Sequence, residues 1–396
     1  MKKQAEIYLN DCGIICALGD SKASVAKNLL ANAQRLVAYD KLFTHRSSYI
    51  GQVDGTLPSI PKTLQDFDCR NNRLLMHAYL QIKPAIDNLI HQYGARRIGI
   101  ILGTSTSGIL EGEKAYAQYT QQGYFPKGFH YKQQEFGQIS RFLAKLIGVQ
   151  GPCYTISTAC SSSGKAFMAA KRLIQSDFCD AVIVGGADTL SALPLNGFDA
   201  LDSVSSSICR PFQQTRDGIN IGEGAGLFIM SKQPGEISLA GGGESSDGFH
   251  ITSPDPEGSG AKKAMQRALD DAGIDKSLIG YINAHGTATP KNDAMESKAI
   301  FEVFGGKTQV SSTKPLTGHT LGAASVIELA LCWLLLSKTY NPDRLLPAQF
   351  QNDDYDQNIA PICLTKGNTH WQTPYFMSNS FAFGGNNVSL IIKGLS

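Results

Sequence analysis

The feature that most constrains the fold is an internal repeat of three landmarks, which occur twice in the same order. The first is an apolar run ending in Gly-Thr-x-Thr, the second a short strand with a polar turn and a small-residue helix, and the third a glycine-rich turn entering an apolar strand. They occupy residues 98–106, 153–167 and 221–230, and again 279–289, 309–324 and 383–392. Any α/β protein contains glycine turns after strands, but three matched landmarks favour duplication. The sequence therefore predicts two related halves, residues 1–235 and 236–396, that meet near residues 232–235.

The predicted strands are apolar on both faces and alternate with helices. Residues 180–185 read Asp-Ala-Val-Ile-Val-Gly, and residues 261–272 have a helical pattern. Strands of this kind are typical of sheets covered by helices on both sides. A chain of 396 residues also exceeds the usual single-domain size. The predicted fold class is therefore α/β, with a large core.

The composition argues against several classes of function. A net charge of +2 gives no overall attraction for nucleic acid or for an anionic membrane. The longest apolar stretch, residues 326–336, contains Glu328 and is too short to span a bilayer. The nine cysteines show neither a C-x-x-C pair nor zinc-type spacing, and the N-terminus has no signal-peptide core. We therefore expect a cytoplasmic protein with no bound metal or cofactor, no nucleic-acid partner and no membrane contact.

Cys160 lies where a predicted strand, residues 153–156, meets a predicted helix, residues 165–174. Backbone N–H groups at a helix N-terminus are unpaired and carry the positive end of the helix dipole. A thiol at that position is expected to shift toward the thiolate, which attacks carbonyl carbon. The alternative is a small buried cysteine packed under a turn. This segment alone supports both interpretations equally.

Two histidines occupy similar places in the second half. His285 follows an apolar strand, and His319 lies between Gly318 and Thr320 before a helix of small residues. Taken singly, they are interpreted as a core histidine and a helix-cap histidine. The repeat favours another interpretation, because a pseudo-twofold fold brings matching corners together and places both imidazoles near Cys160. Such a site is suited to donating ring N–H hydrogen bonds to a substrate.

These residues resemble the signature blocks of the β-ketoacyl-acyl carrier protein synthases, and the resemblance covers essentially the whole chain in order. The matching blocks are Ser157-Thr-Ala-Cys160, His285-Gly-Thr-Ala-Thr-Pro290 with Asp293 and Glu296, Lys314 to His319, Asn379 to Asn387, and residues 11–19, 184–188 and 209–226. The resemblance implies the thiolase fold, in which two pseudo-repeated βα halves form a five-layer α-β-α-β-α core, usually as a dimer.

The resemblance also implies a decarboxylative Claisen condensation. Cys160 would accept an acyl group from a phosphopantetheine thioester. Malonyl on acyl carrier protein would then bind and lose carbon dioxide, and its carbanion would attack the acyl-cysteine. The chain so extended by two carbons would be a fatty acid, a polyketide or a polyene. The implied partner is acyl carrier protein, which carries the substrates on its phosphopantetheine arm.

By the same resemblance, the catalytic residues are Cys160, His285 and His319. The two histidines would donate hydrogen bonds to the enolate of the malonyl thioester, which needs donors placed in advance. Lys314 and Glu296 would support them as a buried charge pair that fixes His319. The alternative for this pair is a plain structural salt bridge.

Four further residues have implied roles around the acyl group. Backbone N–H groups of Cys160 and Phe383 would hold the oxyanion of acyl transfer, and Thr287 and Thr289 would hydrogen-bond the pantetheine arm. Phe381 and Phe383 lie in a loop flanked by glycine and would gate the acyl pocket. The alternative for both rings is an ordinary core position.

Several residues depart from the family pattern near the expected substrate channel. They are Ser161 to Ser163, Asn292, Ala382 and Asn386. We interpret them as signs of a specialised condensing enzyme, such as one of a type II polyketide or polyene pathway. Because acyl carrier proteins are acidic, a basic docking patch is expected as well, with residues 69–73 and 127–132 as candidates.

Alternatives remain from related and unrelated classes. One is a thiolase or initiation-type synthase that uses coenzyme A thioesters, although those relatives lack this two-histidine pattern. Another is a non-catalytic subunit that determines chain length, although such subunits lack the cysteine. A cysteine protease is supported by nothing beyond Cys plus His. The sequence leaves open a homodimer or a heterodimer with a cysteine-less subunit.

Overall fold

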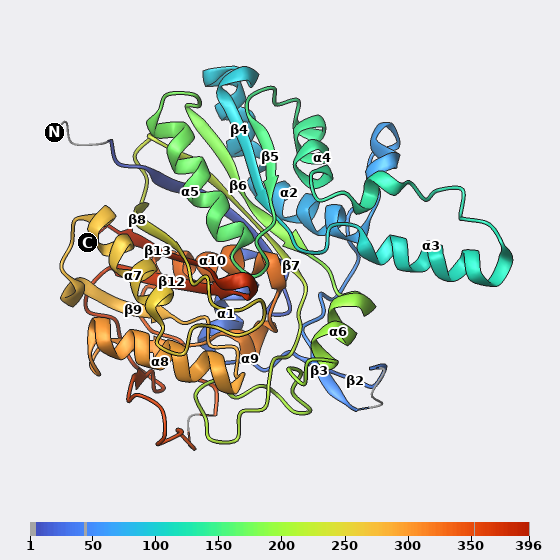
Figure 1. The fold of residues 1–396 in the computed structure, drawn as a ribbon. Coiled ribbons are helices and arrows are strands. Elements are labelled where there is room, and N and C mark those ends of the chain that lie inside the picture. Colours follow the sequence, from blue (N-terminus) through green and yellow to red (C-terminus); the bar gives the residue numbers. More distant parts are fainter. Residues whose placement is uncertain (1–4, 43–45, 352, 396) are drawn as a thin grey trace.

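The structure, a computed structural model that describes residues 5–42, 46–351 and 353–395, is built on a large mixed sheet flanked by helices (Figure 1). Its strands are β1 (Tyr8–Cys16), β2 (Val37–Tyr39), β3 (Ser48–Ile50), β4 (Ile98–Gly103), β5 (Cys153–Ile156), β6 (Ala181–Asp188), β7 (Gly224–Ser231), β8 (Ile237–Ser246), β9 (Ile279–Asn283), β10 (Gln309–Ser311), β11 (Cys363–Leu364), β12 (Tyr375–Ala382) and β13 (Asn386–Gly394). Its α-helices are α1 (Lys22–Leu30), α2 (Arg70–Tyr93), α3 (Ile109–Gln122), α4 (Gln138–Ile147), α5 (Ser162–Gln175), α6 (Ala192–Asp199), α7 (Ser259–Ala272), α8 (Pro290–Phe304), α9 (Lys314–Thr317) and α10 (Ala324–Leu336).

The main sheet contains two groups of strands with the same order and the same directions. The first group runs β5-β4-β6-β7-β1 and the second β10-β9-β12-β13-β8. In each group the first three strands are parallel, and the last two pair antiparallel. The groups meet where Tyr8 of β1 lies opposite Ser238 of β8, and β11 is added beside β10. The loops that follow β4 and β5 therefore have topological counterparts after β9 and β10.

Five layers result from the way helices cover these two groups. Helices α2 and α4 pack on the outer face of the first group, and α7 and α8 pack outside the second. Between the groups lie α5 and α10, which contact each other and strands of both groups. Every residue of α10 is buried, which explains why residues 326–336 form so continuous an apolar run. The α-β-α-β-α arrangement implied by the resemblance is confirmed.

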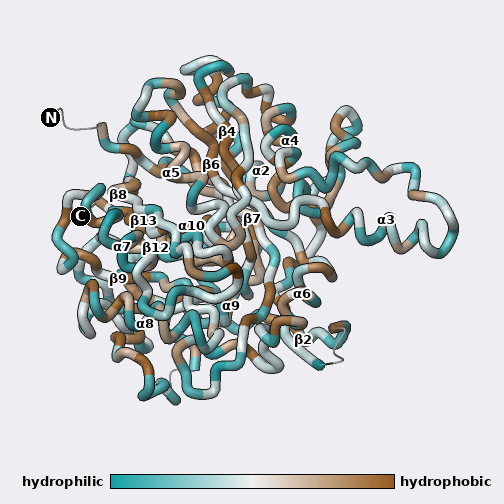
Figure 2. The backbone as a smooth tube through the Cα atoms, in the orientation of Figure 1, coloured by the Kyte–Doolittle hydropathy of each residue, from teal (hydrophilic) through white to brown (hydrophobic). Residues whose placement is uncertain are grey.

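The interior strands have the two-sided burial that their sequence predicts. All residues of β4 and β6 are buried. Figure 2 shows hydrophobic residues along both strands and hydrophilic stretches at the periphery. No helix within the described part of the chain combines the length and apolarity needed to cross a bilayer.

One segment projects from this layered body. Helix α3 and the loop after it extend away from the sheet (Figure 1), stiffened by an aromatic stack in which Tyr119 lies 4.7 Å from Phe125 between ring centroids, and Phe125 lies 5.6 Å from Phe129. Other aromatic side chains on this segment are largely exposed, including Tyr116 at 63% and Tyr131 at 73%. Exposed aromatics at this density are typical of a surface that another protein covers.

Candidate active site

Cys160 sits on a tight turn between β5 and α5. The preceding residue, Ala159, has a left-handed backbone with φ of +52°. The turn is closed by serine hydroxyls, because Ser162 Oγ accepts from Thr158 N at 2.8 Å and donates to Ala159 O at 2.6 Å. Helix α5 begins at Ser162, three residues earlier than the sequence predicted. The thiol thus projects just before the helix N-terminus.

The matching corner of the second half carries His319. After β10 the chain forms the short helix α9 and then Gly318, where φ is +70° and an added Cβ would lie 2.8 Å from Gly222 Cα. His319 is then held by its backbone, which donates from N to Asn220 O at 2.7 Å and accepts at O from Gly222 N at 2.9 Å. A glycine is required here because the two backbones approach so closely.

His285 follows β9, and a carboxylate fixes its backbone. Glu296 of α8 accepts from His285 N at 2.7 Å and from Gly286 N at 2.6 Å. Since Glu296 is fully buried, burial raises its pKa to about 7, against the effect of these two N–H donors. The carboxylate therefore holds the loop that carries the imidazole.

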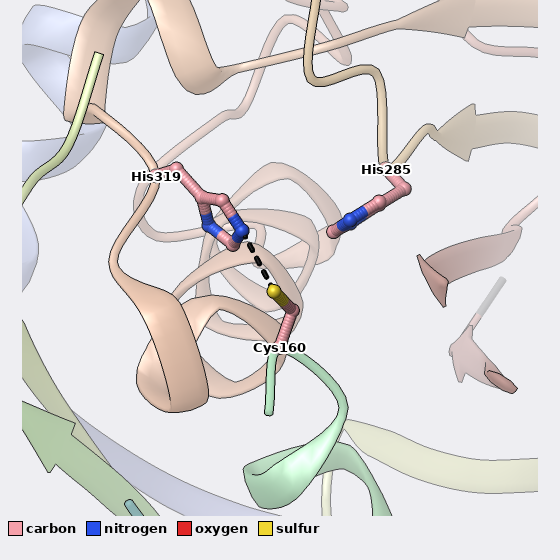
Figure 3. Close-up of side chains that lie close together, drawn as sticks. All are labelled: Cys160, His285 and His319. Carbon is pink, nitrogen blue, oxygen red and sulfur yellow. Dashed lines mark hydrogen bonds between the residues drawn. The ribbon is translucent and has the colours of Figure 1, made fainter. Parts of the chain in front are cut away.

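The three corners bring Cys160, His285 and His319 together, as Figure 3 shows. His319 Nε2 lies 2.9 Å from Cys160 Sγ, and the two imidazole centroids are 5.4 Å apart with the rings almost perpendicular. All three side chains are buried. The convergence that the repeat predicts is thus present in the structure.

Hydrogen bonding assigns the tautomers of both imidazoles. Lys314 Nζ lies 3.5 Å from His285 Nδ1, and because an ammonium only donates, the ring proton of His285 belongs on Nε2. Among the described residues, the buried Nδ1 of His319 has no partner. A proton there would be an unsatisfied buried donor at a cost of about 1–3 kcal/mol, which favours the Nε2–H form. Burial and the Lys314 charge lower the pKa of both histidines well below the usual value, so both are neutral donors.

The thiol differs from the thiolate expected from its place before a helix. Burial raises the pKa of Cys160 to about 12, and the positive charge of Lys314 opposes this only in part. The backbone N–H groups of Cys160 and Phe383 also lower the thiol pKa by hydrogen bonding. Both N–H groups are therefore close to Sγ, where the resemblance requires oxyanion donors. The resting site contains a neutral thiol.

The expected ion pair between Lys314 and Glu296 is wrong. Lys314 Nζ instead forms its salt bridge with Glu328 of α10, and both side chains are at most 3% exposed. Its other contact is with His285, so the lysine does not fix His319. Glu296 is already engaged by two backbone N–H groups, whereas the buried carboxylate of Glu328 on α10 lies within contact of Lys314 Nζ.

Two cavities meet at Cys160. One has a volume of about 270 Å³ and is lined by both histidines, by Thr287 and Thr289, and near the surface by Lys291. The other has a volume of about 330 Å³. Besides Cys160, its lining is Ser105, Thr106, Ile109, Ser157, Ala159, Leu193, Pro194, Phe198 and Leu321. Only Cys160 and Phe198 line both. The thiol thus borders both cavities.

The remaining expected residues surround the first cavity. Thr287 and Thr289 share a hydrogen bond of 2.9 Å between their hydroxyls. The ring of Phe383 lies 5.4 Å from that of Phe198, and Phe381 lies 6.3 Å from His285, between centroids. Gly384, which follows Phe383, has a φ of +77°, and this left-handed backbone conformation favours glycine.

Sequence reasoning missed Asp188, Glu328 and Phe198 as site residues. Asp188 is fully buried at the end of β6 and accepts hydrogen bonds from Thr104 Oγ1, Ser105 N, Thr106 N, Thr106 Oγ1 and Ala323 N. It thereby joins the loop after β4, a wall of the second cavity, to the segment that follows His319. Glu328 could have been identified from the sequence as a lone carboxylate in an apolar run. Nothing in the sequence around Phe198 indicates a role in the site.

The residues that depart from the family pattern have mainly structural contacts. Ser161, Ser162 and Ser163 are fully buried and bond to backbone, and none of them lines either cavity. Asn386 accepts from Lys165 Nζ at 2.9 Å. Asn292 and Ala382 do line the first cavity. Ser161 and Ser162 therefore stabilise the turn, and Ser163 ties the start of α5 to α10.

The two candidate basic patches lie outside both cavities. Arg70 is paired with Glu223 and Arg73 with Asp68, so residues 69–73 present little free positive charge. Lys127 and Lys132 are exposed on the projecting segment after α3. The cation that does line the first cavity is Lys291.

Comparison with known proteins identifies relatives over the whole chain. Residues 12–234 match the family model described as "Beta-ketoacyl synthase, N-terminal domain" and residues 237–345 the model described as "Beta-ketoacyl synthase, C-terminal domain". The chain is 33% identical over 349 residues to 3-oxoacyl-[acyl-carrier-protein] synthase 2 of Staphylococcus aureus, with 82% of each chain covered. It is 31% identical over 428 residues to the enzyme of the same name from Vibrio cholerae, with 98% of each covered.

Solved structures give the same result. A chain of the complex between the ketosynthase ApeO and its chain length factor ApeC from Xenorhabdus doucetiae superposes with a TM-score of 0.94 and 46% identity, covering 99% of this chain and 98% of that one. A β-ketoacyl synthase from Burkholderia phymatum superposes with a TM-score of 0.86 and 26% identity, covering 99% and 100%.

Proposed function

This chain belongs to the β-ketoacyl synthase family of condensing acyltransferases, and we propose that Cys160 is its nucleophile and that His285 and His319 are its enolate donors. The observation that carries the proposal is the convergence of one thiol and two neutral Nε2–H imidazoles at the junction of two cavities. Donors placed in advance at a buried site stabilise developing negative charge far better than donors in water.

The first step is transfer of an acyl group to Cys160. Its sulfur attacks the thioester carbon, the oxyanion is held by the N–H groups of Cys160 and Phe383, and the carrier thiol leaves with the proton that the cysteine gives up. No step needs a second base, because one thiol replaces another. The acyl chain extends into the apolar second cavity, away from the histidines.

The second step occurs in the first cavity. Malonyl thioester enters on a phosphopantetheine arm, for which the hydroxyls of Thr287 and Thr289 are hydrogen-bond partners. Its carbon–carbon bond breaks to release carbon dioxide, and the electron pair forms an enolate whose oxygen accepts from His285 and His319. The enolate carbon then attacks the acyl-cysteine, and the Cys160 thiolate leaves and recovers a proton.

Other residues act through these groups. Lys314 donates to Nδ1 of His285 and so keeps its proton on Nε2, while Glu296 holds the same residue by its backbone. Phe383 belongs to a loop flanked by glycine and packs on Phe198, which lines both cavities. We assign that pair to gating of the acyl group.

Partners follow from the surface around the second cavity. Leu193, which lines that cavity, is 62% exposed, and Ile109, another residue of the lining, is the first residue of the projecting helix α3. We propose that a second subunit of the same fold covers this region. A cysteine-less chain-length-factor-like subunit is the preferred partner, because ApeO is found in complex with its chain length factor ApeC. Acyl carrier protein supplies the substrates.

The architecture supports a proposed division of the chain into duplicated halves, residues 1–235 and 236–396. Strand β7 ends at Ser231 and β8 begins at Ile237, and the strand orders on either side of that connection match. Each half then contributes one part of the chemistry, the nucleophile from the first and the imidazoles from the second.

Intact-mass analysis with a series of acyl carrier proteins tests the two steps separately. We expect the wild type to gain one acyl group and Cys160→Ala to gain none. The His319→Ala variant should retain most of its acylation but lose malonyl decarboxylation, measured as carbon dioxide release, by about a hundredfold or more. Acylation of Cys160→Ala would contradict the nucleophile assignment, and equal loss of both steps in His319→Ala would contradict the division of roles.

A further inference from the structure

Asn292 lines the first cavity and has a polar atom that the protein itself leaves unused. The residue is buried, with 8% of its surface exposed, and it lines the cavity together with Thr287 and Thr289. Its amide nitrogen donates to Asp293 Oδ1 at 3.1 Å and to Glu296 Oε2 at 3.4 Å. Across the described part of the chain, no hydrogen bond reaches its oxygen, Oδ1. A buried acceptor is therefore available at the cavity.

The two carboxylates fix which way the amide of Asn292 faces. Each of their four oxygens also accepts from one backbone N–H group, those of Phe212, Ala288, His285 and Gly286. Because both groups act as acceptors, the amide nitrogen, which only donates, must face them. Neither Asp293 nor Glu296 lines the cavity. The amide oxygen is therefore the atom of this side chain that faces the cavity.

The start of α8 places this oxygen beside two hydroxyls. Thr289 is the N-cap residue of α8 and Asn292 is its third helical residue. Side chains at these two positions approach each other, as they do in a capping box. The Thr289 hydroxyl makes no capping bond and shares a hydrogen bond of 2.9 Å with the Thr287 hydroxyl. Two hydroxyls and one amide oxygen thus line the same wall of the cavity.

The chemistry of this wall matches an amide group. An amide presents a carbonyl, which the hydroxyls can bind as donors, and an N–H, which needs an acceptor. The carboxylates that line the cavity are less suitable acceptors. Asp202 is exposed, and the two oxygens of Asp247 accept from Asn387 Nδ2 and from Asp255 N. The oxygen of Asn292 is buried and has no competing partner.

We propose that Asn292 Oδ1 accepts a hydrogen bond from the amide N–H nearest the thioester of the pantetheine arm. This inference rests on the proposed function, in which the first cavity receives malonyl thioester. The amide nearest the thioester is favoured because Glu296 holds both the Asn292 amide and the backbone of His285. The contact sets how far the arm enters the cavity. Asn292 departs from the family pattern, so the contact is a property of this chain and not of the family as a whole.

Replacing single N–H groups of the substrate tests the contact. The probes are malonyl-pantetheine and two analogues, in each of which an ester oxygen replaces the N–H of one amide. The measurement is kcat/KM for carbon dioxide release by the full-length protein. In the wild type, the analogue changed nearest the thioester should react about tenfold more slowly than malonyl-pantetheine, because Oδ1 loses its donor. The analogue changed at the distant amide should react within about twofold of malonyl-pantetheine.

The same substrates with Asn292→Ala separate binding from a structural role. The variant should be about tenfold slower than the wild type with malonyl-pantetheine, and it should no longer distinguish that substrate from the near-thioester ester. A purely structural role would slow both substrates equally and leave the preference intact. The preference is a ratio within one variant, so a smaller folded fraction cancels. Asn292→Ser keeps a polar group against the carboxylates and should lose the preference too, which covers the case that Asn292→Ala does not fold.

Asn358 provides the matched control, because its amide also donates to a carboxylate, Asp356 Oδ1 at 3.0 Å, but lies outside both cavities. Asn358→Ala should keep the wild-type preference for the amide. A preference that is equal in the wild type and Asn292→Ala, absent from the wild type, or confined to the distant amide would overturn the inference. A protein that releases no carbon dioxide from malonyl-pantetheine or from malonyl carrier protein would instead refute the proposed function.

Discussion

The two proposed halves of the molecule hold topologically equivalent loops by different electrostatic means. In the first half the loop after β4 is fastened by Asp188, a buried carboxylate that accepts hydrogen bonds from neutral hydroxyl and backbone N–H groups. In the second half the loop after β9 is fastened by Glu296. A salt bridge between Lys314 and Glu328 contacts the same loop through Nδ1 of His285. The first half presents Cys160, the proposed nucleophile, and the second presents both imidazoles.

This difference shows how one scaffold is divided between two chemical tasks. A nucleophile needs an exact position and nearby N–H donors, which neutral hydrogen bonds provide. The imidazoles must stay in the Nε2–H form, which requires a cation on the Nδ1 side of His285. The lysine of the second half also lowers the thiol pKa in the first, so the halves are coupled through one charge.

Removing the carboxylate of the salt bridge should have the largest effect on stability. Glu328→Ala leaves the Lys314 ammonium buried without its partner, and breaking such a pair costs about 3–5 kcal/mol. The free energy of unfolding, measured by urea denaturation, should fall by that amount. As a control, Asp87→Ala breaks the exposed Lys83–Asp87 pair and should cost less than about 1 kcal/mol. Similar losses in the two variants would remove the contrast between the halves.

Replacing each fastening carboxylate, Asp188 or Glu296, by its amide should affect a different step of the reaction. Asp188→Asn places an amide N–H₂ group among donors and should cost about 2 kcal/mol of stability. It should slow acyl loading of Cys160, because the second cavity wall loosens, more than it slows malonyl decarboxylation. Glu296→Gln disturbs the His285 loop and should do the reverse. Identical changes in both rates for both variants would show that the loops act as one unit.

Relieving backbone strain should have the smallest effect and should be similar in both halves. Ala159 and Ala288 have φ values of +52° and +62°, in the left-handed region that costs a residue with a Cβ about 1–2 kcal/mol. Glycine removes that cost but loses more entropy on folding, so Ala159→Gly and Ala288→Gly should each stabilise by about 0.5 kcal/mol. Thermal melts followed by circular dichroism measure the change. Destabilisation in only one half would reveal a role for that methyl group.

Much of the fold and the reactive centre could be predicted from the sequence. The run at residues 153–156 is β5, the run beginning at Ile279 is β9, and the repeat brought His285 and His319 to Cys160. These predictions succeeded because strand burial and loop position depend on local pattern and topology, and the same strand order recurs in both groups of strands.

What failed depended on packing between distant elements. The partner of Lys314 could not be chosen from sequence, because Glu296 and Glu328 are both near in the chain and only the path of α10 separates them. The pKa of Cys160 depends on burial beneath two loops rather than on the helix start alone. Ser161 to Ser163 were expected near the substrate channel, but their hydroxyls bond to backbone groups and they line neither cavity.

The meeting of two cavities at a single sulfur has a kinetic consequence. A carrier arm can leave the threonine-lined first cavity while the acyl group stays in the second cavity. The acyl-enzyme therefore persists after the carrier that loaded it has dissociated. The phosphopantetheine arm of the first carrier must leave before the malonyl-bearing arm of the second carrier enters. The kinetics should therefore be ping-pong, with parallel lines in double-reciprocal plots. Unloaded carrier then competes with the malonyl carrier for one entrance. The ratio of spent to charged carriers would set the pace of synthesis.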